Sequence, residues 1–202
     1  MLYLIRHGAT IPNLQKPPVL QGCGIDAELS PEGIAQAKRV ATRFADTPIA
    51  AVYASDLVRA QQTAAAIAEP HGLAVQTAAD IHEIAVGRWE GKSWPQVMAE
   101  QPAAYAKWAG DPGEQRYPGG ESYVDVAARA VPALERIAAA HPESRPLVVA
   151  HRAVIRSVAG RLLGLDPRRW KDVPQENTGV NRLDWDGERL KLVTLNDVTH
   201  LE

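Results

Sequence analysis

The amino-acid sequence predicts an α/β fold with a mostly parallel central sheet. Apolar runs of strand length alternate along the chain with longer segments in which apolar residues recur at helical spacing. This alternation is typical of successive β-α units, whose strands lie parallel and are covered by helices. No repeat, low-complexity segment or linker divides the 202 residues, so we expect a single domain spanning residues 1–202.

The first strand is expected at residues 1–5, an apolar run that Arg6-His7-Gly8 brings to a halt. Residues 9–29 are rich in proline and glycine and are expected to be irregular. A helix should begin after them, because Ser30-Pro31-Glu32 combines a capping hydroxyl, a proline at the first helical position and an acid in the first turn. The apolar face of this helix would be Ile34, Ala37, Val40, Ala41 and Phe44.

The second strand is expected at residues 49–53, followed by Ser55-Asp56 and by a helix at about 57–68. A third, short strand fits residues 74–77. Several tryptophans stand among glycines and prolines at about 78–120, which predicts a cap-like insertion of loops and short helices.

The remaining elements are an Ala-rich helix, a fourth strand, another helix and a hairpin whose turn is Asp186-Gly187. In chain order they are expected at residues 123–140, 147–150, 153–163, 180–185 and 190–195.

Composition excludes several classes of partner. The formal net charge is −2 and no run of Lys or Arg exceeds two residues, so neither a nucleic acid nor an anionic membrane is expected to bind. Cys23 is the only cysteine, which rules out an intrachain disulfide and fits a reducing compartment. No apolar stretch is long enough to span a bilayer, and the N-terminal run is too short for a signal peptide. We therefore expect a cytoplasmic protein.

Polar side chains follow the predicted strands at the points where they end. Arg6-His7-Gly8 follows the first strand, Ser55-Asp56 and then Arg59 follow the second, and His151-Arg152 follows the fourth. Glu83 lies in the loop region after the third. Since ligands of open α/β sheets bind beyond the carboxyl ends of the strands, these groups should gather at one edge of the sheet.

Two histidines, two or three arginines and one carboxylate suit phosphoryl transfer. Arginines clamp a tetrahedral anion, an imidazole can attack phosphorus, and a carboxyl group can protonate a leaving oxygen. Arginines can also supply the positive charge that a metal would otherwise provide. Each residue alone has an ordinary structural explanation, but their joint placement favours catalysis. A metal-dependent hydrolase is disfavoured, because no two histidines have close ligand spacing and an arginine beside a histidine repels a cation.

The motif Leu4-Ile5-Arg6-His7-Gly8-Ala9-Thr10 resembles the signature of the histidine phosphatase superfamily, in its phosphoglycerate mutase-like branch. The resemblance spans almost the whole chain. It continues through Asn13, Gln21-Gly22, residues 29–33, Gln36-Ala37, residues 53–64, 83–91, 119–122 and 149–151, Asn177 and residues 196–201.

This resemblance implies that His7 takes the phosphoryl group in line and that Glu83 acts as general acid and then as the base that activates water. It implies that Arg6, Arg59 and His151 hold the phosphate oxygens. It further implies a three-layer α/β/α sandwich with one antiparallel edge strand, and neither a metal nor an organic cofactor. The candidate substrate-binding residues are Asn13, Gln21, Gly22, Trp89, Arg116 and Arg152.

The sequence departs from the family pattern at two positions. Ala9 stands where many members have Glu, with little consequence. Arg152-Ala153 stands where a pair of small residues is usual. Arg152 has two interpretations: the favoured one is that it points away and pairs with a surface acid, and the other is that it selects a second anionic group of the substrate.

Hydrolysis is favoured over a mutase reaction, because the ending of the chain and residues 86–91 resemble those of the compact bacterial broad-specificity phosphatases. The substrate would be a small phosphomonoester. A catalytically silent phosphate-binding module is disfavoured, since His7, Arg59, Glu83 and His151 are all present. Two questions stay open: whether the chain forms a homodimer and whether His200 reaches the site.

Overall fold

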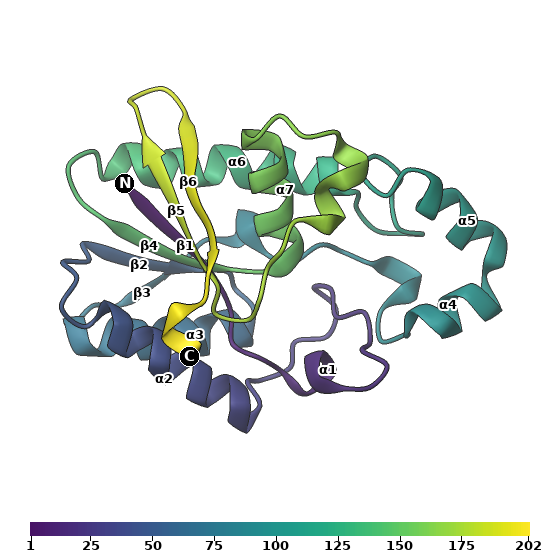
Figure 1. Cartoon of the computed structure of the whole chain (residues 1–202), viewed down its shortest axis with the longest axis horizontal. Coiled ribbons are helices and arrows are strands. Elements are labelled where there is room, and N and C mark those ends of the chain that lie inside the picture. Colours follow the sequence, from purple (N-terminus) through teal and green to yellow (C-terminus); the bar gives the residue numbers. More distant parts are fainter.

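The computed structural model describes residues 1–202 and is built around one six-stranded sheet. Its strands are β1 Leu2–Arg6, β2 Ala51–Ala54, β3 Val75–Thr77, β4 Pro146–Ala150, β5 Val180–Trp185 and β6 Leu190–Asp197. The strand order is β3-β2-β4-β1-β5-β6. The first four strands are parallel, β5 is antiparallel to β1, and β6 is antiparallel to β5. The predicted mostly parallel sheet is confirmed (Figure 1), and the antiparallel pairing expected for one edge strand involves two strands at that edge, β5 and β6.

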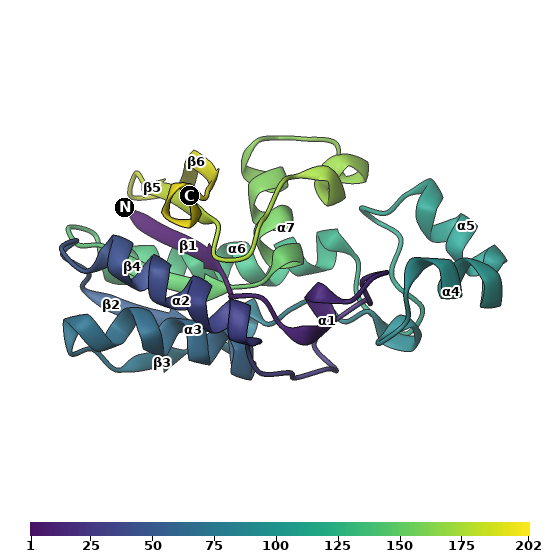
Figure 2. The ribbon, with the colours of Figure 1, turned by 60° about the horizontal axis from the view of Figure 1, so that its bottom comes forward.

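Helices cover both faces of the sheet. The α-helices are α1 Ile11–Leu14, α2 Pro31–Phe44, α3 Val58–Ala68, α4 Trp94–Glu100, α5 Pro102–Gly110, α6 Tyr123–Ala140 and α7 Arg152–Leu162. Short 3₁₀ turns lie at Glu69–His71, Ala79–Ile81, Gly87–Trp89, Pro167–Asp172 and Thr199–Leu201. Figures 1 and 2 show α2 and α3 on one face and α6 and α7 on the other, so the molecule has the expected three layers. No helix is both long and apolar enough to cross a bilayer.

The alternation of side chains along β4 creates two cores. Leu147 and Val149 pack with the apolar faces of α2 and α3, whereas Val148 and Ala150 pack with those of α6 and α7. A strand sends successive side chains to opposite faces, so a strand that is apolar throughout must be buried on both sides. This explains why β4 is buried at every position and why the catalytic candidates can emerge only where the strands end.

Helices α4 and α5 lie beyond the carboxyl ends of the strands, away from the sheet (Figures 1 and 2). They belong to the segment for which loops and short helices were expected. The fully buried ring of Trp89 joins them to the rest, because it contacts Trp94, Trp108 and Tyr117 edge to face. An aromatic cluster thus fixes the position of the two helices beside the end of the sheet.

The sequence patterns did not predict two ordered segments. The stretch expected to be irregular contains α1, whose start is fixed by a capping box between Thr10 and Asn13. The turn Pro167–Asp172 begins where the Asp166 side chain accepts the N–H of Arg168. Both are too short to show an apolar periodicity, so only their capping residues mark them.

Candidate active site

Three strand ends bring the catalytic candidates together. His7, Ser55 and His151 directly follow or lie just beyond the neighbouring parallel strands β1, β2 and β4. The pairing continues past the ends, since the His7 N–H donates to the Ala150 carbonyl at 3.0 Å. The ring centroids of His7 and His151 are 5.1 Å apart. The parallel topology therefore places two imidazoles side by side, as the strand ends predicted.

The imidazole of His7 is buried and held in one tautomer. Its Nδ1 lies 2.7 Å from the carbonyl oxygen of Gly8, which can only accept, so Nδ1 carries the ring proton and Nε2 keeps a free lone pair. Burial lowers the pKa of His7 well below its usual value, and the nearby charges of Arg6 and Arg59 lower it further. A neutral imidazole with an unprotonated Nε2 is the form required of a nucleophile.

The loop that carries His7 is fixed from several directions. The Gly8 N–H donates to Thr63 Oγ1 at 3.0 Å, and that hydroxyl donates in turn to the Arg59 carbonyl at 2.8 Å. On the other side, the Asn177 side chain donates to the His7 carbonyl at 3.0 Å. Sequence reasoning gave Thr63 no role here, because the partner of its hydroxyl is 55 residues away along the chain.

Two buried guanidinium groups lie beside His7. Arg6 donates through Nη1 to the Gln175 carbonyl at 2.8 Å, and Arg59 donates to the carbonyls of Gly22 and Ile25 at 3.0 Å. The Nε group of each arginine is buried and has no partner. Backbone carbonyls therefore fix both side chains while one donor of each stays unused.

His151 has a similar unused donor. Its Nε2 lies 2.7 Å from Ser55 Oγ, which accepts the Leu57 N–H at 3.2 Å and lies 3.4 Å from Asp56 Oδ1. When the Ser55 hydroxyl donates to Nε2, the nearer of its two acceptors, the ring proton is on Nδ1. This Nδ1 is buried without a partner. Burial lowers the pKa of His151 well below its usual value, and Arg59 contributes next.

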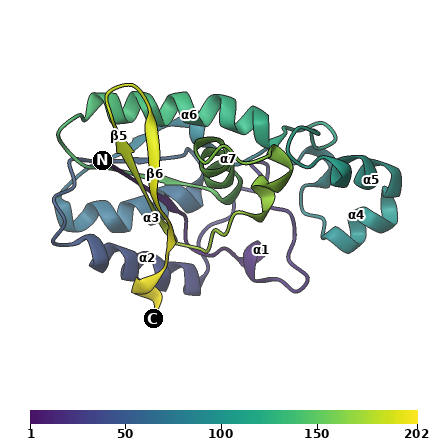
Figure 3. The same ribbon diagram turned by 45° about the horizontal axis from the view of Figure 1, so that its top comes forward.

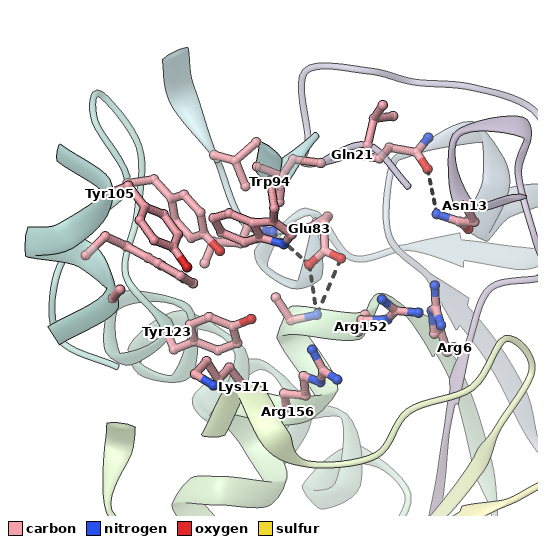
Figure 4. A pocket seen from close by; sticks show the side chains of 18 of the residues that line it. Arg6, Asn13, Gln21, Glu83, Trp94, Tyr105, Tyr123, Arg152, Arg156 and Lys171 are labelled. Carbon is pink, nitrogen blue, oxygen red and sulfur yellow. Dashed lines mark hydrogen bonds between the residues drawn. The ribbon is translucent and has the colours of Figure 1, made fainter. Parts of the chain in front are cut away.

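The Glu83 carboxyl group is almost fully buried. Its Oε1 accepts backbone N–H groups from Ile84 at 2.9 Å and from Ala153, at the start of α7, at 3.2 Å. It lines the same cavity as His7. Figure 4 shows these hydrogen bonds and the carboxyl group facing the open space.

The cavity beside these groups has a volume of about 570 Å³. Asn13 and Gln21 lie at one end and are joined by a hydrogen bond of 3.2 Å (Figure 4). Basic side chains form one part of its wall, and aromatic rings of the segment at 78–123 form another. The cationic lining is Arg6, Arg152, Arg156 and Lys171, and the aromatic lining is Trp94, Tyr105, Trp108, Tyr117 and Tyr123.

Three of the candidate substrate-binding residues lie outside this cavity. Trp89 is enclosed by other aromatic rings and donates through Nε1 to Gln101 at 3.1 Å. The exposed Arg116 forms an ion pair of 2.7 Å with Asp125 and points to solvent. The carbonyl of Gly22 accepts from Arg59, so this residue supports an arginine instead of lining the space.

The favoured interpretation of Arg152 was wrong. No acid lies within ion-pair distance of its guanidinium group, and the side chain lines the cavity. The physical reason is that α7 begins at Arg152, directly after the strand-end His151, so this first helical residue stands beside the site. His200 does not line the cavity and instead contacts Thr178 Oγ1 at 3.0 Å.

Comparisons with known proteins agree with this geometry. The model of the histidine phosphatase superfamily (branch 1) matches residues 2–198. Phosphoglycerate mutase-like protein 4 of Arabidopsis thaliana is 35% identical over 204 residues, which cover 100% of this chain and 86% of that protein. Glucosyl-3-phosphoglycerate phosphatase of Mycobacterium tuberculosis is 35% identical over 177 residues, which cover 84% of this chain and 78% of that protein.

Among solved structures, that of Bacillus stearothermophilus YhfR superimposes with a TM-score of 0.90 at 28% identity, covering 100% of this chain and 98% of that one. The fold is therefore shared over the full length, and the family motif coincides with the cluster at the strand ends. The chain belongs to branch 1 of the histidine phosphatase superfamily and is a phosphomonoester hydrolase of that superfamily.

Proposed function

We propose that this protein hydrolyses small organic phosphomonoesters through a phosphohistidine on Nε2 of His7, with water as the final acceptor. One observation carries the proposal. The buried Nε groups of Arg6 and Arg59 and the buried Nδ1 of His151 have no partner, and all three side chains lie near the neutral imidazole of His7. Buried polar atoms are nearly always hydrogen-bonded, so three free donors around one nucleophile indicate a place for an anion with several oxygens.

In the first step, Nε2 of His7 attacks phosphorus in line. The N–P bond forms as the bond from phosphorus to the leaving oxygen breaks, and the Glu83 carboxyl group gives its proton to that oxygen. Arg6, Arg59 and His151 donate to the remaining phosphoryl oxygens. Because these donors are fixed before the reaction, they stabilise the charge on the transferring group without reorganising.

In the second step, the Glu83 carboxylate takes a proton from water while the water oxygen attacks phosphorus. The N–P bond breaks, phosphate leaves, and both His7 and the protonated Glu83 are restored. The positive charge of the two arginines supplies what a metal ion would supply in other phosphatases. We accordingly propose that no metal or organic cofactor takes part.

The segment at 78–120 acts as a cap over the leaving group in this proposal, within a single domain of residues 1–202. Its support is the position of Trp94 and Trp108, whose stacked rings, 4.7 Å apart, belong to helices α4 and α5 and line the cavity. The cavity is much larger than one phosphate group needs, so the leaving group would occupy the part beside these rings. Asn13 and Gln21 lie at the opposite end and would contact the phosphoryl group.

The decisive experiment measures phosphate release from a panel of small phosphomonoesters in excess chelator, with wild type and His7→Ala compared. Release that resists chelation and disappears in the variant is expected. The panel includes 3-phosphoglycerate, and its isomers are analysed, because return of the phosphoryl group to the acceptor would contradict water as the final acceptor. Binding of phosphate without turnover in wild type would contradict catalysis.

A further inference from the structure

We infer that Arg152 and Arg156 form a second anion-binding subsite, so that the preferred substrates carry a second anionic group, a carboxylate or a phosphate, on the leaving group. This inference rests on the proposed function, because it concerns the part of the same cavity that holds the leaving group. It concerns selection among phosphomonoesters and leaves the chemistry at His7 unchanged.

The two arginines share one face of α7. They are four residues apart at its N-terminal end, so their side chains project to the same side. Both line the cavity that contains Arg6 and His7. Figure 4 shows the guanidinium groups of Arg152 and Arg156 directed into the open space below Glu83, with Arg6 beyond Arg152.

Neither arginine has an acidic partner. No carboxylate lies within ion-pair distance of Arg152 or Arg156. Glu83 is the one acid in the cavity lining, and its oxygens already accept two backbone N–H groups. The Nε of Arg156 donates to the Val173 carbonyl at 2.7 Å, which orients the guanidinium group beside the Tyr123 hydroxyl and leaves it without an acidic partner.

Lys171 also lines this wall, but its ammonium group is 2.8 Å from the Asp172 carboxylate. A partner of opposite charge already neutralises it. Apart from Arg6, which the proposed function assigns to the phosphoryl group, the cationic residues of the lining without an ion-pair partner are Arg152 and Arg156.

The empty arrangement is electrostatically unfavourable. Like charges four residues apart on a helix repel each other, and cations at the positive end of the helix dipole are destabilised. The first turn of α7 has no acid to offset them. Arg152 is exposed at the mouth of the cavity, and desolvation by the wall, followed by the charge of Arg156, lowers its pKa. A bound anion would relieve both the repulsion and the unfavourable interaction with the helix dipole.

The two subsites are adjacent. The charge of Arg152 is, after burial, the largest influence that lowers the pKa of Arg6, one of the proposed phosphoryl-binding residues. A substrate whose second anion is separated from the phosphoryl group by a short carbon chain could therefore contact both. Phosphorylated hydroxy acids and small bisphosphates have this shape, and a neutral polyol phosphate lacks the second anion.

The test uses substrates that differ only in the second group. Glycerol 3-phosphate and 3-phosphoglycerate differ by a carboxylate, and 3-hydroxypropyl phosphate and 1,3-propanediol bisphosphate differ by a phosphate. We expect wild-type kcat/KM to favour the doubly anionic member of at least one pair by about tenfold or more, the size of a charge-assisted hydrogen bond. The pair that shows the preference identifies the anion.

Arg152→Gln and Arg156→Gln should each reduce this preference by about tenfold, mainly through KM. Arg161→Gln is the matched control, because it removes the same charge from an exposed position in the last turn of α7. Its preference should equal that of wild type. A wild-type ratio near one in both pairs, or ratios that neither cavity variant changes, would overturn the inference.

Failure of the proposed function would look different, since no member of either pair would be hydrolysed. The subsite would then be tested by calorimetric binding of 3-phosphoglycerate and glycerol 3-phosphate to wild type and Arg152→Gln. Tighter wild-type binding of 3-phosphoglycerate that Arg152→Gln abolishes would support the subsite, and equal affinities would overturn it.

Discussion

Most polar side chains around His7 are fixed by hydrogen bonds, while a few of their buried donor atoms have no partner. Nδ1 of His7 is bound to the Gly8 carbonyl, Arg6 and Arg59 are fixed by carbonyls, and Ser55 Oγ contacts Nε2 of His151. The free atoms are the lone pair of His7 Nε2 and one donor on each of the other three side chains. The proposed nucleophile and the groups proposed to stabilise charge are thus held in place without a substrate.

Replacing Glu83 with Gln should affect substrates according to their leaving group. The amide keeps an acceptor for the N–H groups of Ile84 and Ala153 but cannot protonate the leaving oxygen. We expect kcat/KM to fall by roughly 10²- to 10⁴-fold for alkyl phosphates and much less for p-nitrophenyl phosphate, whose leaving group needs little protonation.

Glu90→Gln provides the comparison for this measurement. The Glu90 carboxylate accepts the N–H of Gly22 at 2.6 Å and has no place in the cavity lining, so any loss should be the same for both substrates. Equal losses for the two substrates in Glu83→Gln would contradict its role as the acid.

Residue positions were predictable where the backbone dictates them. His7 and His151 follow apolar strands, and parallel strands end at the same edge, so their meeting followed from the pattern alone. Arg152, Trp89 and Arg116 were harder, because a loop or a helix start gives no periodicity from which to infer the direction of a side chain. Arg116 forms an ion pair with Asp125, in the first turn of a helix. This contact depends on the path of the chain between the two residues, which has no sequence pattern.

At the level of elements, the start of α2 is docked directly on the loop that carries His7. Gly8 and Gly33 approach so closely that a Cβ on Gly33 would lie 2.0 Å from the Ala9 carbonyl oxygen. The Ser30 hydroxyl donates to that same carbonyl at 3.0 Å. The Ser30-Pro31-Glu32 signal correctly located the helix start, but the contact across the loop could not be read from local sequence.

Gly33→Ala should therefore displace α2 from this loop. Overpacking of this kind costs about 1–3 kcal/mol, and the shift should also lower kcat because it moves the backbone next to His7. Chemical unfolding and steady-state kinetics would measure the two effects. Gly110→Ala is the matched control, since a Cβ there meets no atom within 4 Å. A Gly33→Ala protein with unchanged stability and activity would contradict the close docking.

The C-terminal turn after β6 contacts residues that hold the His7 loop in place. Figure 3 shows this segment descending from the hairpin toward α2. The Nε2 of His200 lies 3.0 Å from the hydroxyl of Thr178, a buried residue with φ of 58°. The Nδ1 of His200 lies 3.3 Å from Nη1 of Arg43, on α2. Asn177, next to Thr178, donates to the His7 carbonyl. The contacts thus connect His200 to the catalytic loop.

His200→Ala should reduce kcat by a small factor, about threefold to tenfold, because a hydrogen bond of about 1 kcal/mol that holds Thr178 in this conformation is lost. KM should change little, since His200 does not line the cavity. Steady-state kinetics would separate the two parameters. An effect confined to KM would indicate that His200 touches substrate after all.

Considered as a whole, the molecule places two buried imidazoles between its two apolar cores. Burial lowers the pKa of His7 and His151, so both rings are neutral in the native state at pH values where the unfolded chain begins to bind protons. The unfolded state therefore holds more protons than the native state below about pH 6.5. The free energy of unfolding must then decrease as the pH falls below this value.

Each histidine contributes a slope of up to about 1.4 kcal/mol per pH unit. His7 and His151 should therefore dominate the loss of stability between about pH 6.5 and 5, with a smaller part from His200, whose pKa is also lowered by desolvation and by Arg43. Ion-paired carboxylates act at lower pH, because their pKa values are lowered, as that of Asp197 is by Arg43. Urea unfolding at a series of pH values measures how the free energy of unfolding changes with pH. The slope of this change should be about half as large in His7→Gln as in wild type. His71→Gln, on the distal turn Glu69–His71, controls for the loss of a histidine. If His7→Gln retained the full slope, folding would not lower the pKa of His7, and its ring would be protonated below about pH 6.5, without a lone pair on Nε2 for attack on phosphorus.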